Sequence, residues 1–157
     1  IAGTLAQSAV PRLHVRSLCA DWAIGAEKLY EILAVMEAVD LLRILRLEHD
    51  NKARSVGEKL FFADPAFYSV LHGNSGTARE ALTACLVSSA GWTVEAVRDE
   101  TAGDFVLSRN VSAGIEKLKI EVGGAHKKSK RADFVIRDDL DYPAGNAIPL
   151  WLLGMAY

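Results

Sequence analysis

Apolar residues recur at helical spacing near the start of the chain. In the segment 26–39 they follow one another at steps of one and three, which places them on one stripe of a helix. The segment 16–22 shows similar spacing, and a short turn containing Gly25 separates the two. The pattern predicts two helices joined by a tight turn, which is the helix-turn-helix arrangement. The longer stripe consists of Leu29, Ile32, Leu33, Met36 and Val39.

Two strand-like runs follow these helices. Residues 41–47 and 59–62 are mostly apolar, and the polar loop 48–57 joins them. Two strands joined by a polar loop directly after a helix-turn-helix describe a winged helix, so we expect a winged-helix domain over 1–72. Pro65 opens a further short helix in this region, because proline is tolerated at the first helical position.

A cluster of turn-forming residues at 72–76 ends this region, and an α+β pattern follows. We expect a long helix over 76–90 and a final helix in the apolar tail 148–157, with its apolar side chains in the core. The second domain is therefore predicted over 73–157. Between the helix and the tail, four segments have strand character: 92–97, 104–107, 117–122 and 133–136.

Composition narrows the class of protein. The chain has 157 residues, of which 50% are hydrophobic and 24% are charged, so it is not disordered, collagen-like or a disulfide scaffold. Its formal charge of −2 provides no chain-wide basic field for nucleic acid or anionic lipid. The charge-free stretch 142–157 is too short to span a bilayer of about 30 Å, so we expect no membrane partner.

Cys19 and Cys85 lie far apart in the sequence, among apolar neighbours. We interpret both as small buried thiols in a reducing compartment, which predicts a cytoplasmic location, although the sequence does not exclude their pairing. The chain starts at Ile1, without an initiator methionine or the charged segment of a signal peptide. We therefore expect it to be a piece of a longer protein.

Three acidic residues form the main candidate site. Glu80 lies on the expected long helix, while Asp104 and Glu121 lie on the polar faces of two strands joined as a hairpin. In metal-dependent nucleases two such carboxylates hold Mg²⁺, which polarises the scissile phosphate and activates a bound water. A lysine two residues after the second strand acid usually completes such a site, and here that position is Gly123.

Each acid also has a purely structural interpretation. Glu80 fits a first helical turn, where the helix dipole favours a negative charge. Asp104 follows a glycine, as in a common turn, and Glu121 fits an ion pair with Lys119 or with a cross-strand partner.

Five short motifs follow one another along the second half of the chain: Gly76-Thr77-Ala78-Arg79-Glu80, Gly103-Asp104-Phe105-Val106-Leu107, Ile120-Glu121-Val122-Gly123-Gly124, Asp138-Asp139 and Ile148-Pro149-Leu150-Trp151-Leu152-Leu153-Gly154. Their order resembles the C-terminal region of prokaryotic AAA-superfamily ATPases of largely uncharacterised role. In that family a P-loop ATPase domain precedes a winged helix and a domain related to the PD-(D/E)xK nuclease fold. The resemblance implies an α+β chain: a winged helix-turn-helix, then a restriction-endonuclease-like α/β/α domain with a mixed sheet.

The resemblance also implies roles for single residues. Glu80 matches the helix acid, Asp104 the metal-binding aspartate and Glu121 the strand glutamate, so Asp104 and Glu121 are the Mg²⁺ ligands if the site is active. The chain departs from the pattern at the lysine. Lys119, Lys127 or Lys128 are the candidates to fill that gap. The resemblance therefore implies a nuclease-like fold more than an active nuclease.

The implied function is an accessory region of a cytoplasmic ATPase, with the upstream ATPase domain of the same chain as its partner. ATP would bind in that upstream domain, because this sequence contains no Gly-Lys-Ser/Thr motif. Two alternatives stay open at this stage. One is a Mg²⁺-dependent DNA nuclease, and the other is a DNA-binding winged-helix module.

The sequence contains one dense basic run, at 126–131. Exposed cations in such a loop bind nucleic-acid phosphates irrespective of base sequence, but we favour the interpretation of the run as a solvated surface loop. The second helix of the expected helix-turn-helix carries four acids and one base, which would repel phosphate, so we favour a protein contact there. The cations of the basic run that we assign to phosphate contacts are Lys127, Lys128, Lys130 and Arg131.

Overall fold

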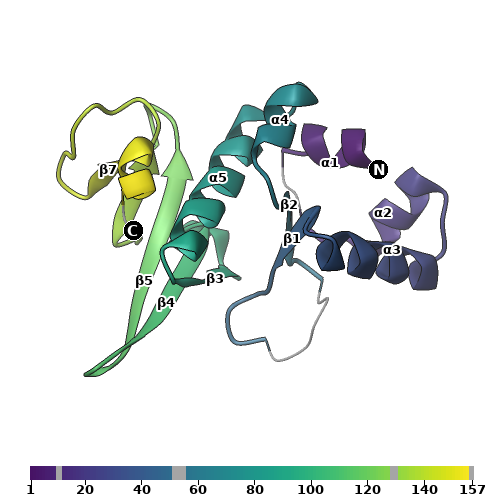
Figure 1. Ribbon diagram of the computed structural model, residues 1–157, viewed down its shortest axis with the longest axis horizontal. Coiled ribbons are helices and arrows are strands. Elements are labelled where there is room, and N and C mark those ends of the chain that lie inside the picture. Colours follow the sequence, from purple (N-terminus) through teal and green to yellow (C-terminus); the bar gives the residue numbers. More distant parts are fainter. Residues whose placement is uncertain (10–11, 51–55, 128–130, 156–157) are drawn as a thin grey trace. The chain divides into compact units, whose positions relative to one another are not determined.

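The computed structural model describes residues 1–9, 12–50, 56–127 and 131–155, and it is a mixed α and β structure. The chain forms two compact units, Ile1–Ala78 and Arg79–Tyr157. The division falls within the helix Ser75–Ser89 (α5), a few residues after the boundary predicted at 72/73. Figure 1 shows the elements of both units. No helix among the described residues is long and apolar enough to cross a membrane.

The first unit contains the predicted pair of helices and a two-stranded sheet. The helices α2 (Val15–Trp22) and α3 (Ala26–Ala38) lie within a residue of the predicted segments. Ala23 follows α2 in the left-handed conformation, with a φ of 52°, which reverses the chain between the two helices. The other elements of the unit are α1 (Ala2–Gln7), β1 (Leu42–Leu45), β2 (Lys59–Phe62) and α4 (Ala66–Val70).

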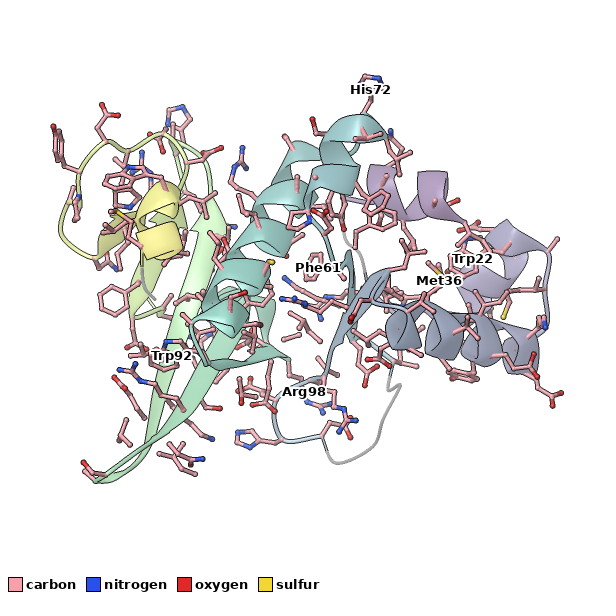
Figure 2. The ribbon with its side chains drawn as sticks, in the orientation of Figure 1. Trp22, Met36, Phe61, His72, Trp92 and Arg98 are labelled. Atoms are coloured by element: carbon pink, nitrogen blue, oxygen red, sulfur yellow. The ribbon has the colours of Figure 1, made fainter. Side chains whose placement is uncertain are left out.

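Strands β1 and β2 pair antiparallel, from Leu42 opposite Phe62 to Leu45 opposite Lys59. Arg12 adds an isolated antiparallel bridge to Lys59 on the other side of β2. The core of this unit is formed by leucines of the helices and by aromatic residues of β2 and α4; Phe61, labelled in Figure 2, is 1% exposed. Burial of these side chains provides the main stabilising term of the unit.

The second unit is a five-stranded mixed sheet in the order β3-β4-β5-β6-β7. The first three strands are antiparallel neighbours, and β6 and β7 continue parallel to β5. The longest strand, β5, lies at the centre, with β4 beside it as a hairpin (Figure 1). The elements are β3 (Thr93–Ala96), η1 (Glu100–Ala102), β4 (Phe105–Val111), β5 (Gly114–Gly123), β6 (Phe134–Arg137), β7 (Ala147–Pro149) and η2 (Leu150–Met155).

The tail differs in part from the prediction of a final helix over 148–157 with its apolar side chains in the core. It forms β7 and then a 3₁₀-helix, because Pro149 lacks a backbone N–H and favours extended backbone before it. Leu150 is buried, but Trp151 is 53% and Met155 71% exposed, so the expectation that all apolar tail residues are core is wrong. The two cysteines are free and half-buried rather than fully buried.

Candidate functional site

The β4–β5 hairpin brings two of the predicted acids together. The ladder pairs Phe105 with Ile120, so Asp104 lies opposite Glu121 at the end of the hairpin. Two hydrogen bonds hold Asp104 against β5: its N–H donates to the Ile120 carbonyl at 2.8 Å, and its Oδ2 accepts the Val122 N–H at 2.9 Å. The position of this carboxylate is therefore determined by the backbone of the neighbouring strand.

Glu121 is one of the few charged residues buried among the described residues, at 7% exposure. A carboxylate that loses water needs a compensating charge, since burial disfavours its ionised form. Lys127 provides that charge, with its Nζ 2.5 Å from Glu121 Oε1. The Lys127 side chain is 44% exposed, so the ion pair lies at the surface end of the site.

The third acid, Glu80, acts on the same ammonium. The hydrogen bond to Glu121 raises the pKa of Lys127 above its ordinary value, against the opposing effect of partial burial. The negative charges of Glu121, Asp104 and Glu80 add to this upward shift of the Lys127 pKa. Charges of acids on α5, just before β4 and on β5 thus act on a single cation. We call Glu80, Asp104, Glu121 and Lys127 the acid–lysine site.

The absence of a side chain at Gly123 allows Lys127 to reach Glu121. A tight turn follows β5, in which the Lys127 N–H donates to the Gly124 carbonyl at 2.9 Å. This turn lays the Lys127 stem over Gly123, where a Cβ would stand 2.5 Å from Lys127 Cβ and 2.9 Å from Cδ. The space of a side chain at position 123 is therefore occupied by the side chain of Lys127.

Lys119 and Lys128 were the other candidates for the missing ammonium. The backbone of Lys119 is held by Asp133: the Lys119 N–H donates to Asp133 Oδ2 at 2.7 Å, and the Asp133 N–H donates to the Lys119 carbonyl at 2.8 Å. Lys128 lies outside the described residues. The ion pair of Glu121 shown by the structure is with Lys127.

Two arginine–aspartate pairs involve the fourth motif. Arg79, adjacent to Glu80 on α5, places its Nε 2.5 Å from Asp138 Oδ2. Arg137 makes two hydrogen bonds to Asp139, which hold the pKa of that carboxyl below its ordinary value. Sequence reasoning missed Arg79 as a site residue, although its position inside the first motif was a signal for it. The Arg79–Asp138 pair connects α5 with the end of β6, whereas the Arg137–Asp139 pair is local to that end.

The predicted phosphate-binding run is only partly described. Arg131 bonds Asp99 at 3.0 Å and also donates to the Thr101 hydroxyl. Hydrogen bonds from Thr101, with a smaller contribution from Arg131, lower the pKa of Asp99. Lys128 and Lys130 lie outside the described residues, as do Lys52 and Arg54 of the loop between β1 and β2. Both described cations of the run, Lys127 and Arg131, are thus paired with acids.

The donor set of the acid–lysine site is chemically suited to a hard divalent cation. Asp104 and Glu121 provide carboxylate oxygens, the ligand type that Mg²⁺ prefers. Lys127 already bonds one oxygen of Glu121, so a cation at that oxygen would compete with the ammonium. Among residues 1–9, 12–50, 56–127 and 131–155, no group of three or more His, Cys, Asp or Glu side chains is arranged to hold a metal ion.

Comparisons of the chain with protein-family models, with curated proteins and with solved structures found no match.

Proposed function

We propose that this chain is an accessory region of an AAA-superfamily ATPase, formed by a winged helix and a nuclease-like domain that does not cleave nucleic acid. The order of the five motifs supports the parentage. The observation that carries the nuclease-like part is the acid–lysine site, in which Lys127 neutralises Glu121 beside Asp104. The mixed sheet that positions these residues is the kind of sheet the resemblance implies.

The first unit supports the winged-helix part. Helix, tight turn, helix and antiparallel strand pair follow in the expected order, and the bridge from Arg12 to Lys59 adds a short third strand position. The exposed side of α3 carries Val35, at 62% exposure, and Val39 just after the helix, at 65%. Exposed valines among acids suit a protein surface better than DNA phosphates, so the ATPase domain is the proposed partner.

The ion pair of Glu121 with Lys127 supports an inactive site. One oxygen of this buried carboxylate is committed to Lys127 at 2.5 Å, and the ordinary lysine position is a glycine. A catalytic metal would have to displace that ammonium from a partly desolvated ion pair. The gain from metal binding would have to offset the loss of this ion pair and the partial dehydration of the metal ion. The accessory region would then transmit nucleotide-driven motion of the parent protein to a partner.

A Mg²⁺-dependent DNA nuclease is the second candidate, and one observation favours it. Lys127 fills the space at position 123, so it supplies an ammonium near where the family pattern has its lysine. In this alternative Asp104 and Glu121 hold the metal, Lys127 stabilises the charge that develops on the phosphate, and Glu80 is a supporting acid.

A cleavage assay separates the two candidates. Supercoiled plasmid and labelled oligonucleotides are incubated with the chain and Mg²⁺ or Mn²⁺, with EDTA as the blank. Asp104→Asn tests the site, and Asp141→Asn, at an exposed position, is the matched control. We expect no metal-dependent cleavage by any of the three proteins. Cleavage by the wild type that is lost in Asp104→Asn and kept in Asp141→Asn would establish the nuclease instead.

The parentage has its own test, which is the sequence upstream of Ile1 in the encoding gene. We expect a phosphate-binding loop with a Gly-Lys-Ser/Thr motif there. An upstream sequence without such a loop would contradict the ATPase part of the proposal and leave the acid–lysine site unaffected.

A further inference from the structure

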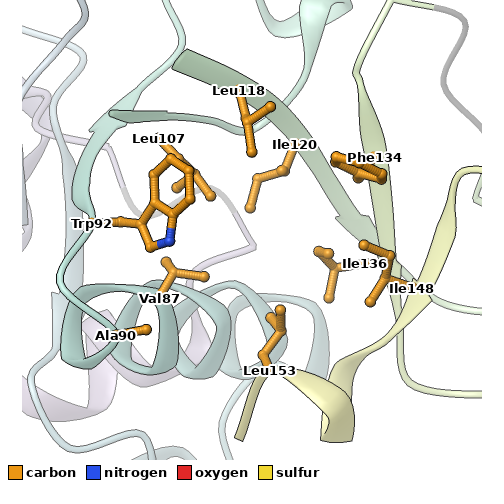
Figure 3. Close-up of a pocket in the computed structure, with 10 residues that line it drawn as sticks. All are labelled: Val87, Ala90, Trp92, Leu107, Leu118, Ile120, Phe134, Ile136, Ile148 and Leu153. Atoms are coloured by element: carbon orange, nitrogen blue, oxygen red, sulfur yellow. The ribbon is translucent and has the colours of Figure 1, made fainter. Parts of the chain in front are cut away.

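The second unit contains an apolar cavity of about 140 Å³ (Figure 3). Ten residues line it, contributed by the C-terminal part of α5, the turn between α5 and β3, the strands β4 to β7 and the helix η2. All ten are apolar, and the indole N–H of Trp92 is the only polar side-chain atom they have. A water molecule needs two to four polar partners, so water gains little in this cavity.

The cavity has a buried aliphatic floor and a half-buried rim. Val87, Ile120 and Ile136 on the floor are 6%, 2% and 2% exposed. Trp92 and Phe134 on the rim are half-buried and lie on opposite sides of the cavity (Figure 3). The guanidinium of Arg109 lies 4.2 Å from the Trp92 ring centroid, which holds this part of the rim in place.

We propose that this cavity binds a small uncharged aromatic molecule of one ring or a fused ring pair. An engineered apolar cavity of about 150 Å³ stays dry and binds benzene, so the volume here suits a ligand of roughly six to nine heavy atoms. Aromatic walls favour an aromatic ligand, because ring pairs gain energy beyond area burial. A charged ligand is disfavoured, since the ten lining residues offer only the indole N–H of Trp92 in place of its hydration.

This ligand site is independent of the acid–lysine site. Side chains alternate between the two faces of a strand, so Ile120 faces the cavity while Glu121 faces the opposite side of β5. Variants of the acid–lysine site therefore serve as controls for ligand binding. Glu121→Gln removes the charge on one face and leaves the cavity lining unchanged.

The experiment uses the full chain with benzene and indole as probes and benzoate as the charged comparison. Binding is followed by the shift of side-chain methyl resonances on titration and by the change in the melting temperature. Ala90→Phe places a ring in the cavity from the residue that directly follows α5. Leu82→Phe adds a ring to α5 at an exposed position that does not line the cavity, and is the matched control. Leu153→Ala enlarges the cavity.

We expect saturable binding of benzene and indole by the wild type, Leu82→Phe and Glu121→Gln, and no binding of benzoate. Ala90→Phe weakens binding by about tenfold or more, because the ligand must compete with the introduced ring. Leu153→Ala shifts the preference from benzene toward indole, which tests the proposal even where Ala90→Phe does not fold. Absence of saturable binding to the wild type, or benzoate binding equal to that of benzene, would overturn the proposal.

Discussion

The side chain of Lys127 lies where a side chain at position 123 would begin. A Cβ on Gly123 would stand 2.5 Å from Lys127 Cβ, whereas non-bonded carbon atoms pack at about 3.5–4.0 Å. Glycine is therefore required at 123 as long as Lys127 remains in place. The acid–lysine site has room for one side chain there, and the turn after β5 delivers it from position 127.

Substitution of Gly123 by alanine tests this relationship. The added methyl group collides with the Cβ end of Lys127, which is attached to the backbone and can move only with the turn. We expect Gly123→Ala to lower the free energy of unfolding by about 1–3 kcal/mol. Gly154→Ala, where nothing lies within 4 Å of the added Cβ, should change it by less than about 0.5 kcal/mol. Urea unfolding measures both.

The methyl group added in Gly123→Ala collides with Lys127, so the loss of unfolding free energy should depend on the residue at position 127. In a Lys127→Gly background no Cβ remains to collide, and the cost of Gly123→Ala should fall to that of the Gly154→Ala control. An equal cost in both backgrounds would show that the glycine is needed for another reason.

The Lys127–Glu121 ion pair predicts a dependence of stability on alkaline pH. The pKa of Lys127 is raised in the folded chain above its ordinary value of 10.5, mainly by the hydrogen bond to Glu121. A raised lysine pKa contributes stability that is present below the unfolded-state pKa and is lost as the pH rises through the folded-state pKa. The difference in unfolding free energy between wild type and Lys127→Met should therefore be constant from pH 7 to about 10 and shrink above it.

Denaturant unfolding over a series of pH values measures this difference. Lys117→Met, at an exposed position on β5, the strand of Glu121, is the control. Its difference in unfolding free energy from the wild type should show no decline at alkaline pH. A difference that stays constant through the strongly alkaline range would contradict the ion pair as the source of the Lys127 contribution.

Hydrophobic periodicity predicted those helices and strands whose conformation is determined by their own local sequence. The apolar stripe of 26–39 gives α3, and the run 59–62 gives β2 with the predicted bounds. The sequence placed Asp104 and Glu121 on the polar faces of two hairpin strands, and the pairing register of the structure brings them opposite each other. These features depend on local pattern, and a pattern can be recognised in a single sequence.

The position of Lys127 could not be predicted in the same way. Three lysines were within reach of Glu121 by sequence distance, and the choice depends on the conformation of the turn after Gly123-Gly124. Glycine allows many backbone conformations, so the sequence does not specify which one this turn adopts. The exposed Trp151 and Met155 illustrate another limit, because apolar composition indicates burial only on average.

Asp104 also has a structural role, so substitutions at this position affect the stability of the chain as well as the acid–lysine site. Its Oδ2 accepts the N–H of Val122, which is 5% exposed. Asp104→Ala leaves that buried donor without this acceptor, and we expect a loss of about 1–3 kcal/mol of unfolding free energy. Asp104→Asn retains an acceptor oxygen and should cost less. Amide hydrogen exchange at Val122 distinguishes the two, since exchange should be faster in the alanine variant. Equal exchange in both variants would show that the bond does not protect this amide.

In the first unit, Tyr68 makes a buried hydrogen bond that can be tested in the same way as the Asp104–Val122 bond. Its side chain is 2% exposed, and its hydroxyl oxygen accepts the Phe62 N–H at 3.2 Å. The ring also meets that of Phe62 edge to face, with centroids 5.2 Å apart. Tyr68→Phe keeps the ring contact and removes the acceptor, so the expected loss is that of one buried hydrogen bond, about 1–2 kcal/mol. Tyr142→Phe, at 80% exposure, should change the unfolding free energy by less than about 0.5 kcal/mol. If the two variants were equally stable, the hydroxyl of Tyr68 would contribute nothing to the end of β2, and ring packing alone would account for its burial.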